Sequence, residues 1–138
     1  MDIVEKAEKI LEGKSDVMLA SINEKGYPRI CTVSKSRSDG ICKIWVSTNI
    51  NSSKVRHFKN NPKSSICFDD GANGVSLTGK VALKQDLETK KEFWLDWFIN
   101  YYPGGVTDPD YCILEFTTEE ATLFIDNELI TLSVNYKY

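Results

Sequence analysis

The sequence predicts a mainly β (α+β) fold, an antiparallel barrel of six to seven strands with peripheral helices. Short runs rich in β-branched and aromatic residues recur along the 138-residue chain, separated by turn-forming residues. Three helical segments interrupt these runs, without the regular alternation of strand and helix found in parallel α/β proteins. With 41% hydrophobic residues and no low-complexity linker, the chain is expected to form one domain over residues 1–138.

The chain begins with a predicted amphipathic helix over residues 2–13. Its apolar residues recur at helical spacing, Asp2 is placed to cap the first turn, and Gly13 is placed to end the last. The candidate strand segments, from which the six to seven strands of the barrel would come, lie over residues 17–22, 29–34, 41–47, 64–69, 75–83, 112–117, 122–126 and 128–134.

The connections between these strands have their own signals. Gly26 is expected to take a positive φ in the first hairpin turn, and the polar residues 35–40 are expected to form a loop. Gly79 interrupts its strand, which predicts a bulge or a bend of the barrel. A second long helix is expected over residues 86–100, with Asp86 as its cap.

The net charge and the N-terminal sequence disfavour a nucleic-acid-binding, a membrane or a secreted protein. A formal net charge of -3 and a pI near 5.2 give no general attraction for nucleic acid or for an anionic membrane. The N-terminus lacks the basic and apolar pattern of a signal peptide, and no apolar run has the length needed to cross a bilayer. We therefore expect a cytoplasmic protein.

Neither the cysteines nor the single histidine predicts a metal site. The cysteines form no CxxC pair and lie in apolar or β-branched runs, so all four are expected to be buried as small hydrophobic residues. A lone histidine such as His57 is more often a helix-surface residue than a metal ligand. The cysteines are Cys31, Cys42, Cys67 and Cys112.

Residues 45–62 are the strongest candidate for a binding site. A strand runs into hydroxyl residues and a lysine at the start of a short helix, where unpaired backbone N–H groups and the helix dipole favour an anion. The side chains of Thr48, Ser52, Ser53 and Lys54 can all donate hydrogen bonds to phosphate oxygens.

The helix in this segment has a simpler interpretation as well. Val55 and Phe58 are spaced to pack inward, and the Asn-Asn-Pro sequence at 60–62 ends the helix. On local features alone, Ser52 and Ser53 could serve only as helix caps.

Two further groups of residues carry side chains that occur in functional sites. Aromatic residues at 94, 97, 98 and 101 have the spacing of one helix face, which favours packing against the core or a partner subunit, with stacking on a ligand ring as the alternative. The carboxylate pairs are expected to be solvated and are given no catalytic role. They are Asp69 with Asp70, Asp108 with Asp110, and Glu119 with Glu120.

Several motifs occur in a fixed order along the chain. They are Gly26-Tyr27-Pro28-Arg29, Trp45-Val46-Ser47-Thr48, Ser53-Lys54-Val55 with Asn60-Asn61-Pro62, and Val75-Ser76-Leu77-Thr78-Gly79-Lys80-Val81. In this ordered series the chain resembles the pyridoxamine 5'-phosphate oxidase-like split-barrel superfamily, and most closely the branch called general stress protein 26, over roughly residues 16–120.

This resemblance implies a homodimer that binds FMN in clefts between its two barrels. Carried over by position, Arg29 and Lys54 would face the FMN phosphate, and backbone groups of residues 30–32 would line the isoalloxazine edge. The complete set of cofactor-binding residues implied by the resemblance is Arg29, Ile30, Cys31, Thr32, Ser47, Thr48, Ser52, Ser53 and Lys54. Without the resemblance, Arg29 would be taken as a solvated strand residue and Thr32 as half of a cross-strand pair.

Three departures from the oxidase argue against pyridoxamine phosphate oxidation. Gly74 stands where the oxidase has a flavin-contacting glutamine, and Ser53 stands where it has an arginine. The oxidase's C-terminal segment, which clamps the substrate, has no counterpart in residues 127–138.

Three functions remain open from the sequence. The leading function is that of an FMN-dependent, stress-related oxidoreductase acting on a small molecule. The bound flavin would supply the chemistry, and the chain shows no strong group of catalytic residues. The alternatives are a non-catalytic flavin-binding stress protein and a haem-handling split barrel, for which His57 would be the one imidazole ligand.

Overall fold

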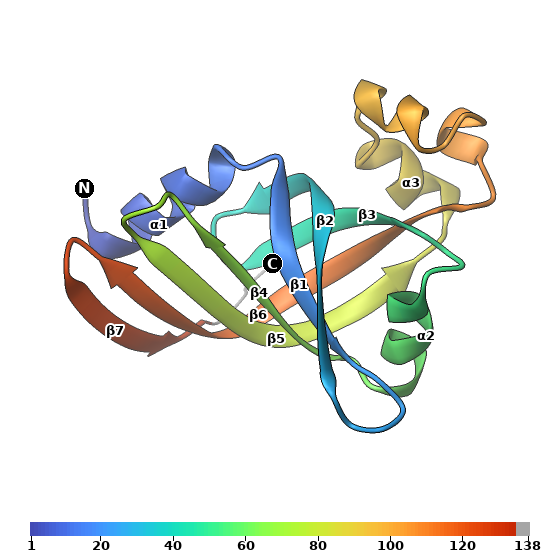
Figure 1. Ribbon diagram of the computed structural model, residues 1–138. Helices are drawn as coiled ribbons and strands as arrows, with labels where there is room; N and C mark the ends of the chain where they lie inside the picture. The colour runs from blue at the N-terminus through green and yellow to red at the C-terminus, as the bar shows by residue number, and fades with distance from the viewer. Residues whose placement is uncertain (135–138) are drawn as a thin grey trace.

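A computed structural model of the protein, described over residues 1–134, shows an antiparallel β-barrel (Figure 1). The strands pair in the order β3-β2-β1-β4-β5-β6-β7, and a further pairing of β3 with β6 closes the first six into a barrel. The predicted barrel with peripheral helices is therefore confirmed. The strands are β1 (Asp16–Ile22), β2 (Pro28–Asp39), β3 (Lys43–Asn49), β4 (Lys63–Asp69), β5 (Gly74–Lys84), β6 (Tyr111–Ile125) and β7 (Glu128–Ser133).

The helices lie at the periphery of the barrel (Figure 1). Helix α1 (Ile3–Glu12) lies at one end, and α2 (Ser53–Asn60) lies towards the other end, near the β1–β2 hairpin. Residues 86–110, which we call the aromatic lobe, stand apart from the barrel in the upper right of Figure 1. The lobe contains α3 (Leu87–Glu92) and two short 3-10 helices, Asp96–Asn100 and Gly105–Thr107.

The expected ends of α1 and of the first hairpin are confirmed. Asp2 Oδ1 accepts a hydrogen bond of 2.8 Å from the backbone N–H of Glu5, and Gly13 follows the last helical residue as the C-cap. Gly26 has a φ of 83° in the hairpin turn, a backbone conformation that costs glycine little. These local signals correctly placed the first helix and the first pair of strands.

The barrel interior forms one apolar core, and a second cluster lies on the outside of β3. Because side chains alternate along a strand, Ile44 and Val46 face the barrel interior while Trp45 faces the aromatic lobe. The Trp45 ring stacks on Phe93 with 4.6 Å between centroids. This second cluster fixes the lobe against β3. Its buried members are Trp45, Phe93, Phe98, Tyr102, Tyr111 and Ile113.

The single long helix predicted over residues 86–100 is wrong. Asp86 does cap a helix, but α3 ends at Glu92, and Leu95 adopts extended backbone before the next 3-10 turn. The break lets Phe93 stack on Trp45 while Phe98 is buried completely in the second cluster. Tertiary packing of the aromatic rings has therefore overridden a pattern with helical spacing.

Two expected interruptions of the sheet are absent. Residues 35–40 do not form a loop, because β2 continues through a bulge between Lys35 and Arg37, with Lys35 donating to the carbonyl oxygens of Leu11 and Glu12. The two strands expected at 112–117 and 122–126 are the single strand β6, whose polar middle pairs with both β5 and β7.

A bulge is present beside Gly79, but it lies in the partner strand, and burial of all four cysteines is not confirmed. The register between β5 and β6 shifts at Thr78 and Gly79, where Glu119 of β6 is the extra residue. Among the cysteines Cys112 is buried, Cys31 and Cys42 are half-buried, and Cys67 is exposed. Cys67 lies on the outer face of β4, because it pairs with the outward-facing Met18 of β1.

Candidate functional site

The candidate site lies where β2 and β3 part. Their pairing ends at Ser34 and Ser47, and residues 28–33 of β2 have a hydrogen-bonded neighbour on one side only, β1. A hollow of about 260 Å³ lies at this fork. It is lined by Thr32, Val33, Ser34, Ser47, Thr48, Asn49, Lys54, Tyr101 and Tyr102.

Helix α2 brings a positive charge to the fork. Lys54 Nζ donates to Thr48 Oγ1 at 3.0 Å, and Thr48 Oγ1 lies 3.4 Å from Ser52 Oγ. Ser52 is the N-cap of α2 but makes no side-chain capping bond, so its hydroxyl is not committed to the helix backbone. Within residues 1–134, no salt bridge joins Lys54 to a carboxylate. The ammonium group is therefore available to a bound anion.

The remaining chemistry of the hollow also suits an anion. No carboxylate is among the described residues that line it, and its polar side chains include the hydroxyl donors Ser47 and Thr48. Behind Thr48, burial raises the pKa of the Cys112 thiol to about 11, and Sγ lies 3.4 Å from the carbonyl oxygen of Thr48. Cys112 is therefore a protonated, buried thiol and does not act as a nucleophile.

The structure brings together four of the nine residues expected in the cofactor site. Thr32, Ser47, Thr48 and Lys54 line the hollow, and Ser52 adjoins it through its contact with Thr48.

The other four expected residues do not line it. Ile30 is 67% exposed on the outer face of β2, Ser53 is exposed, and Cys31 is half-buried beside Leu19. Arg29 is exposed, but it pairs with Ser21 and so shares the face of the sheet that α2 covers.

Sequence reasoning did not assign the two tyrosines of the site to cofactor binding. Tyr101 and Tyr102 come from the aromatic lobe and form one wall of the hollow. Tyr101 is 64% exposed, whereas Tyr102 is 6% exposed. Tyr101 was expected on a packed helix face, with stacking on a ligand ring as the alternative, and Tyr102 falls outside the helical spacing of positions 94, 97, 98 and 101.

His57 is buried in α2, contrary to its expected surface position. It is 4% exposed, its Nδ1 lies 2.9 Å from Ser21 Oγ, and its Nε2 lies 3.9 Å from a carboxylate oxygen of Glu24. With one ring nitrogen hydrogen-bonded and the whole ring covered, His57 offers no open ligand position. Residues 1–134 also contain no group of three His, Cys, Asp or Glu side chains arranged to hold a metal ion.

Of the carboxylate pairs, most members are solvated as expected, but Asp108 is not. It is 9% exposed, and its two side-chain oxygens accept backbone hydrogen bonds of 2.9 Å from Gly104 and Asp110. These bonds hold the pKa of the Asp108 carboxyl below its usual value. Its role is to shape the turn that follows Tyr102.

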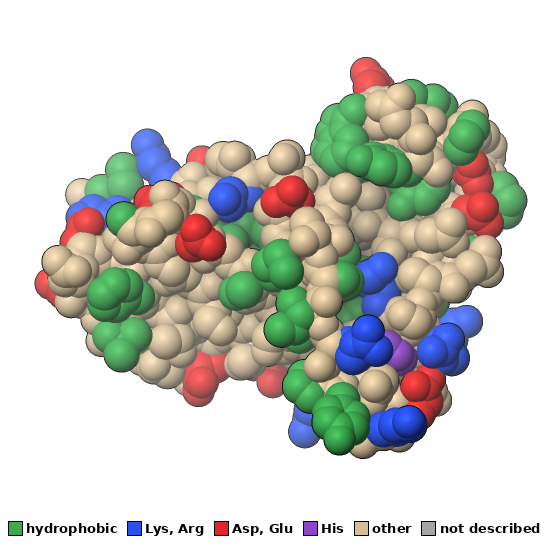
Figure 2. Space-filling model, in the orientation of Figure 1, with side chains coloured by type: hydrophobic (Ala, Val, Ile, Leu, Met, Phe, Trp, Pro, Cys, Tyr) green, Lys and Arg blue, Asp and Glu red, His purple; other side chains and the backbone are tan. Residues whose placement is uncertain are grey.

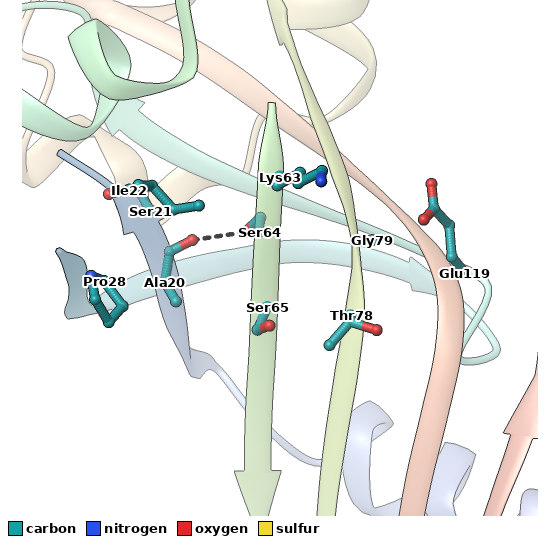
Figure 3. A pocket seen from close by; sticks show the side chains of 10 residues that line it. All are labelled: Ala20, Ser21, Ile22, Pro28, Lys63, Ser64, Ser65, Thr78, Gly79 and Glu119. Carbon is teal, nitrogen blue, oxygen red and sulfur yellow. Dashed lines mark hydrogen bonds between the residues drawn. The ribbon is translucent and has the colours of Figure 1, made fainter. Parts of the chain in front are cut away.

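A second, more apolar hollow lies on the outer face of the barrel across β1, β4 and β5 (Figure 3). Its volume is about 320 Å³. Strands β1 and β4 pair only from Met18 to Ala20, and the Ser64 hydroxyl donates to the Ala20 carbonyl oxygen at 2.7 Å where the strands begin to separate. Ile22 and Pro28 line the same hollow, so it joins the exposed apolar face of β1 and β2.

The barrel that opens between β2 and β3 beside a short helix defines a split-barrel protein. The sequence model of the family described as Pyridoxamine 5'-phosphate oxidase matches residues 3–124. The chain therefore belongs to the pyridoxamine 5'-phosphate oxidase family. No helix of the described residues is both long and apolar enough to cross a membrane.

Solved structures agree with this assignment. A Clostridium acetobutylicum protein related to general stress protein 26 of B. subtilis, of the pyridoxinephosphate oxidase family, is 32% identical, with 97% of each chain covered and a TM-score of 0.89.

Two more distant structures share the fold. The general stress protein 26 of Bacillus anthracis str. Sterne is 19% identical, with 96% of this chain and 100% of that one covered and a TM-score of 0.80. A heme binding protein from Mycobacterium smegmatis is 16% identical, with 96% and 58% covered and a TM-score of 0.79. No curated protein matches this sequence.

Proposed function

We propose that this protein binds FMN at the fork between β2 and β3 and serves as an oxidoreductase for a small molecule. The observation that carries the proposal is the meeting of Lys54, Thr48 and Ser47 at the start of α2, in one hollow that no carboxylate of residues 1–134 lines. Hydroxyl donors and an ammonium group at a helix N-terminus suit a phosphate. The free edge of β2 beside the hollow offers backbone N–H and C=O groups to a planar heterocycle.

The bound flavin would supply the redox chemistry, and the protein would position it and control access to it. Pyridoxamine phosphate is not the proposed substrate. Gly74 has no side chain to reach a cofactor, and it lines a separate hollow with Cys67 and Phe124 rather than the fork. The C-terminal segment expected to lack the oxidase's substrate clamp covers residues 127–138, and its last four residues, 135–138, lie outside the described part of the chain.

We also propose that the protein is a homodimer formed through the outer face of β1 and β2. Met18 and Ile30 are 38% and 67% exposed on this face, and the apolar hollow of Figure 3 continues it towards β5. A contiguous exposed apolar patch of this kind usually marks an interface. A second copy seated here would lie beside the outward-facing Thr32 at the rim of the cofactor site.

Titration of the purified protein with FMN and with riboflavin tests cofactor binding. Quenching of flavin fluorescence should give clearly tighter binding for FMN, because only FMN carries the phosphate that Lys54 would bind. A protein that takes up neither flavin would overturn the proposal, and equal affinities would show that the phosphate site is misassigned. Anaerobic bleaching of the bound flavin by NADH or NADPH then separates an oxidoreductase from a non-catalytic flavin-binding protein.

The haem-handling alternative receives no support from His57. Its ring is covered and hydrogen-bonded to Ser21, so it does not present a free nitrogen to a haem iron. A Soret band on addition of haem to the parent protein that disappears in His57→Leu would contradict this conclusion.

A further inference from the structure

We propose that Tyr102 donates a hydrogen bond to the phosphate of the bound cofactor, which makes the aromatic lobe a part of the binding site. This inference rests on the proposed FMN site and adds a donor that comes from neither β2, β3 nor α2. Tyr102 lines the same hollow as Lys54 and Thr48 while remaining 6% exposed.

The backbone of Tyr102 is held in place from both sides. Its N–H donates to the carbonyl oxygen of Phe98 at 2.9 Å, and its own carbonyl oxygen accepts from the N–H of Gly105 at 2.9 Å. Its ring packs against Phe98 and Tyr111 with centroid distances of 6.4 and 5.1 Å. The position of the phenol is thus set before any ligand arrives, and binding need not order this side chain.

The phenol of Tyr102 is in the neutral form that can donate a hydrogen bond. Burial raises the pKa of Tyr102, and a hydrogen bond with the Ser47 side chain opposes that rise only in part. The group therefore stays a neutral O–H donor near neutral pH. A phenolate here would repel a phosphate, whereas a neutral phenol next to Ser47 can donate to one of its oxygens.

The charges around the hollow show why a phosphate is the favoured partner. Lys54 supplies the positive charge, and Ser47, Thr48 and Tyr102, which line the same hollow, supply hydroxyl donors. On the surface, Lys and Arg side chains gather around α2 and the hairpin, and hydrophobic side chains gather on the aromatic lobe (Figure 2). The phosphate end of the ligand would lie towards α2, with the tyrosine wall closing it from the lobe.

The test compares Tyr102→Phe with Tyr27→Phe. Both changes remove one tyrosine hydroxyl, but Tyr27 lies 64% exposed in the β1–β2 hairpin and does not line the hollow. Tyr102→Phe should weaken FMN binding by about tenfold, the usual effect of losing a hydrogen bond to a charged group, and should leave riboflavin binding unchanged. Tyr27→Phe should leave both affinities unchanged.

Flavin fluorescence quenching gives the affinities, and the phosphorus NMR shift of bound FMN reports on the phosphate directly. If Tyr102→Phe binds FMN as tightly as the parent does, the inference about Tyr102 is wrong, while the proposed FMN site still stands. Equal losses for FMN and riboflavin would also overturn the inference, because the hydroxyl would then only support the shape of the hollow. A parent protein that binds no FMN would overturn the proposed function itself.

Discussion

Ser21 of β1 and His57 of α2 form a buried hydrogen bond, with 2.9 Å between Oγ and Nδ1. Both side chains are 4% exposed. On the other side of the ring, Glu24 of the hairpin turn lies 3.9 Å from Nε2 and makes a 2.6 Å ion pair with Arg56. These contacts connect the hairpin that leads into Arg29 with the helix that carries Lys54. Arg29 and Lys54 are the two positive charges expected at the phosphate site.

Ser21→Ala should lower the free energy of unfolding by about 1 to 3 kcal/mol, because a buried ring nitrogen of His57 loses its partner. Urea denaturation measures the change. Ser76→Ala, at an exposed serine of β5, should have little effect. In a His57→Leu background the cost of Ser21→Ala should shrink, and strict additivity of the two changes would show that the bond does not contribute.

Lys54→Ala should weaken FMN binding by about 1 to 3 kcal/mol through loss of a charge-assisted bond to phosphate, and should leave riboflavin binding unchanged. The matched control is Lys59→Ala, which removes an exposed lysine near the other end of α2. Fluorescence titrations at low and high salt give the affinities. If Lys59→Ala and Lys54→Ala cost the same, the attraction is diffuse and Lys54 has no specific place in the site.

Ile30→Glu should break the proposed homodimer, because it places a charge in an apolar face of β2 that a second copy would cover. Leu129→Glu is a close control, since Leu129 of β7 is 68% exposed and Ile30 is 67% exposed. Light scattering after size exclusion should give half the parent mass for Ile30→Glu and the parent mass for Leu129→Glu. A parent protein that is already a monomer would contradict the dimer proposal.

The sequence predicted those parts of the fold that depend on local signals. The cap at Asp2, the positive φ at Gly26 and the inward packing of Val55 and Phe58 all follow from residue type and spacing over a few positions, and all are present. The ordered motifs also led to the correct family.

The errors lie where distant segments decide the outcome. Trp45 on β3 determines where α3 stops, because Phe93 stacks on it. Lys35 is buried because the carbonyl groups at the end of α1 lie beside it, so a polar segment continues as strand. Tyr102 reaches the hollow because its ring packs against Phe98 and Tyr111, in the cluster that also contains Trp45 of β3. Local periodicity contains no information about such contacts.

Gly79→Ala should destabilise the barrel by about 3 kcal/mol or more, since overpacking and backbone displacement at a buried position are among the costliest changes. An added Cβ would lie 1.9 Å from the carbonyl oxygen of Thr117 in β6. Gly74→Ala, on the same strand, meets nothing within 4 Å and should be close to neutral. Thermal unfolding of both variants measures the difference, and equal melting temperatures would show that the bulge can relax to accept a methyl group.

Asp108→Asn should reduce stability at pH 7 but not in acid. In the folded protein, backbone hydrogen bonds from Asp110 and Gly104 hold the pKa of Asp108 below its usual value. The unfolded chain therefore binds the proton more readily, and the ionised carboxylate contributes stability above its unfolded pKa of about 3.9. That contribution is lost as the pH falls through the folded pKa. Urea unfolding at a series of pH values should show the parent and Asp108→Asn converging below about pH 4. A gap that stays constant across that range would mean that the turn after Tyr102 depends on the shape of Asp108 and not on its charge.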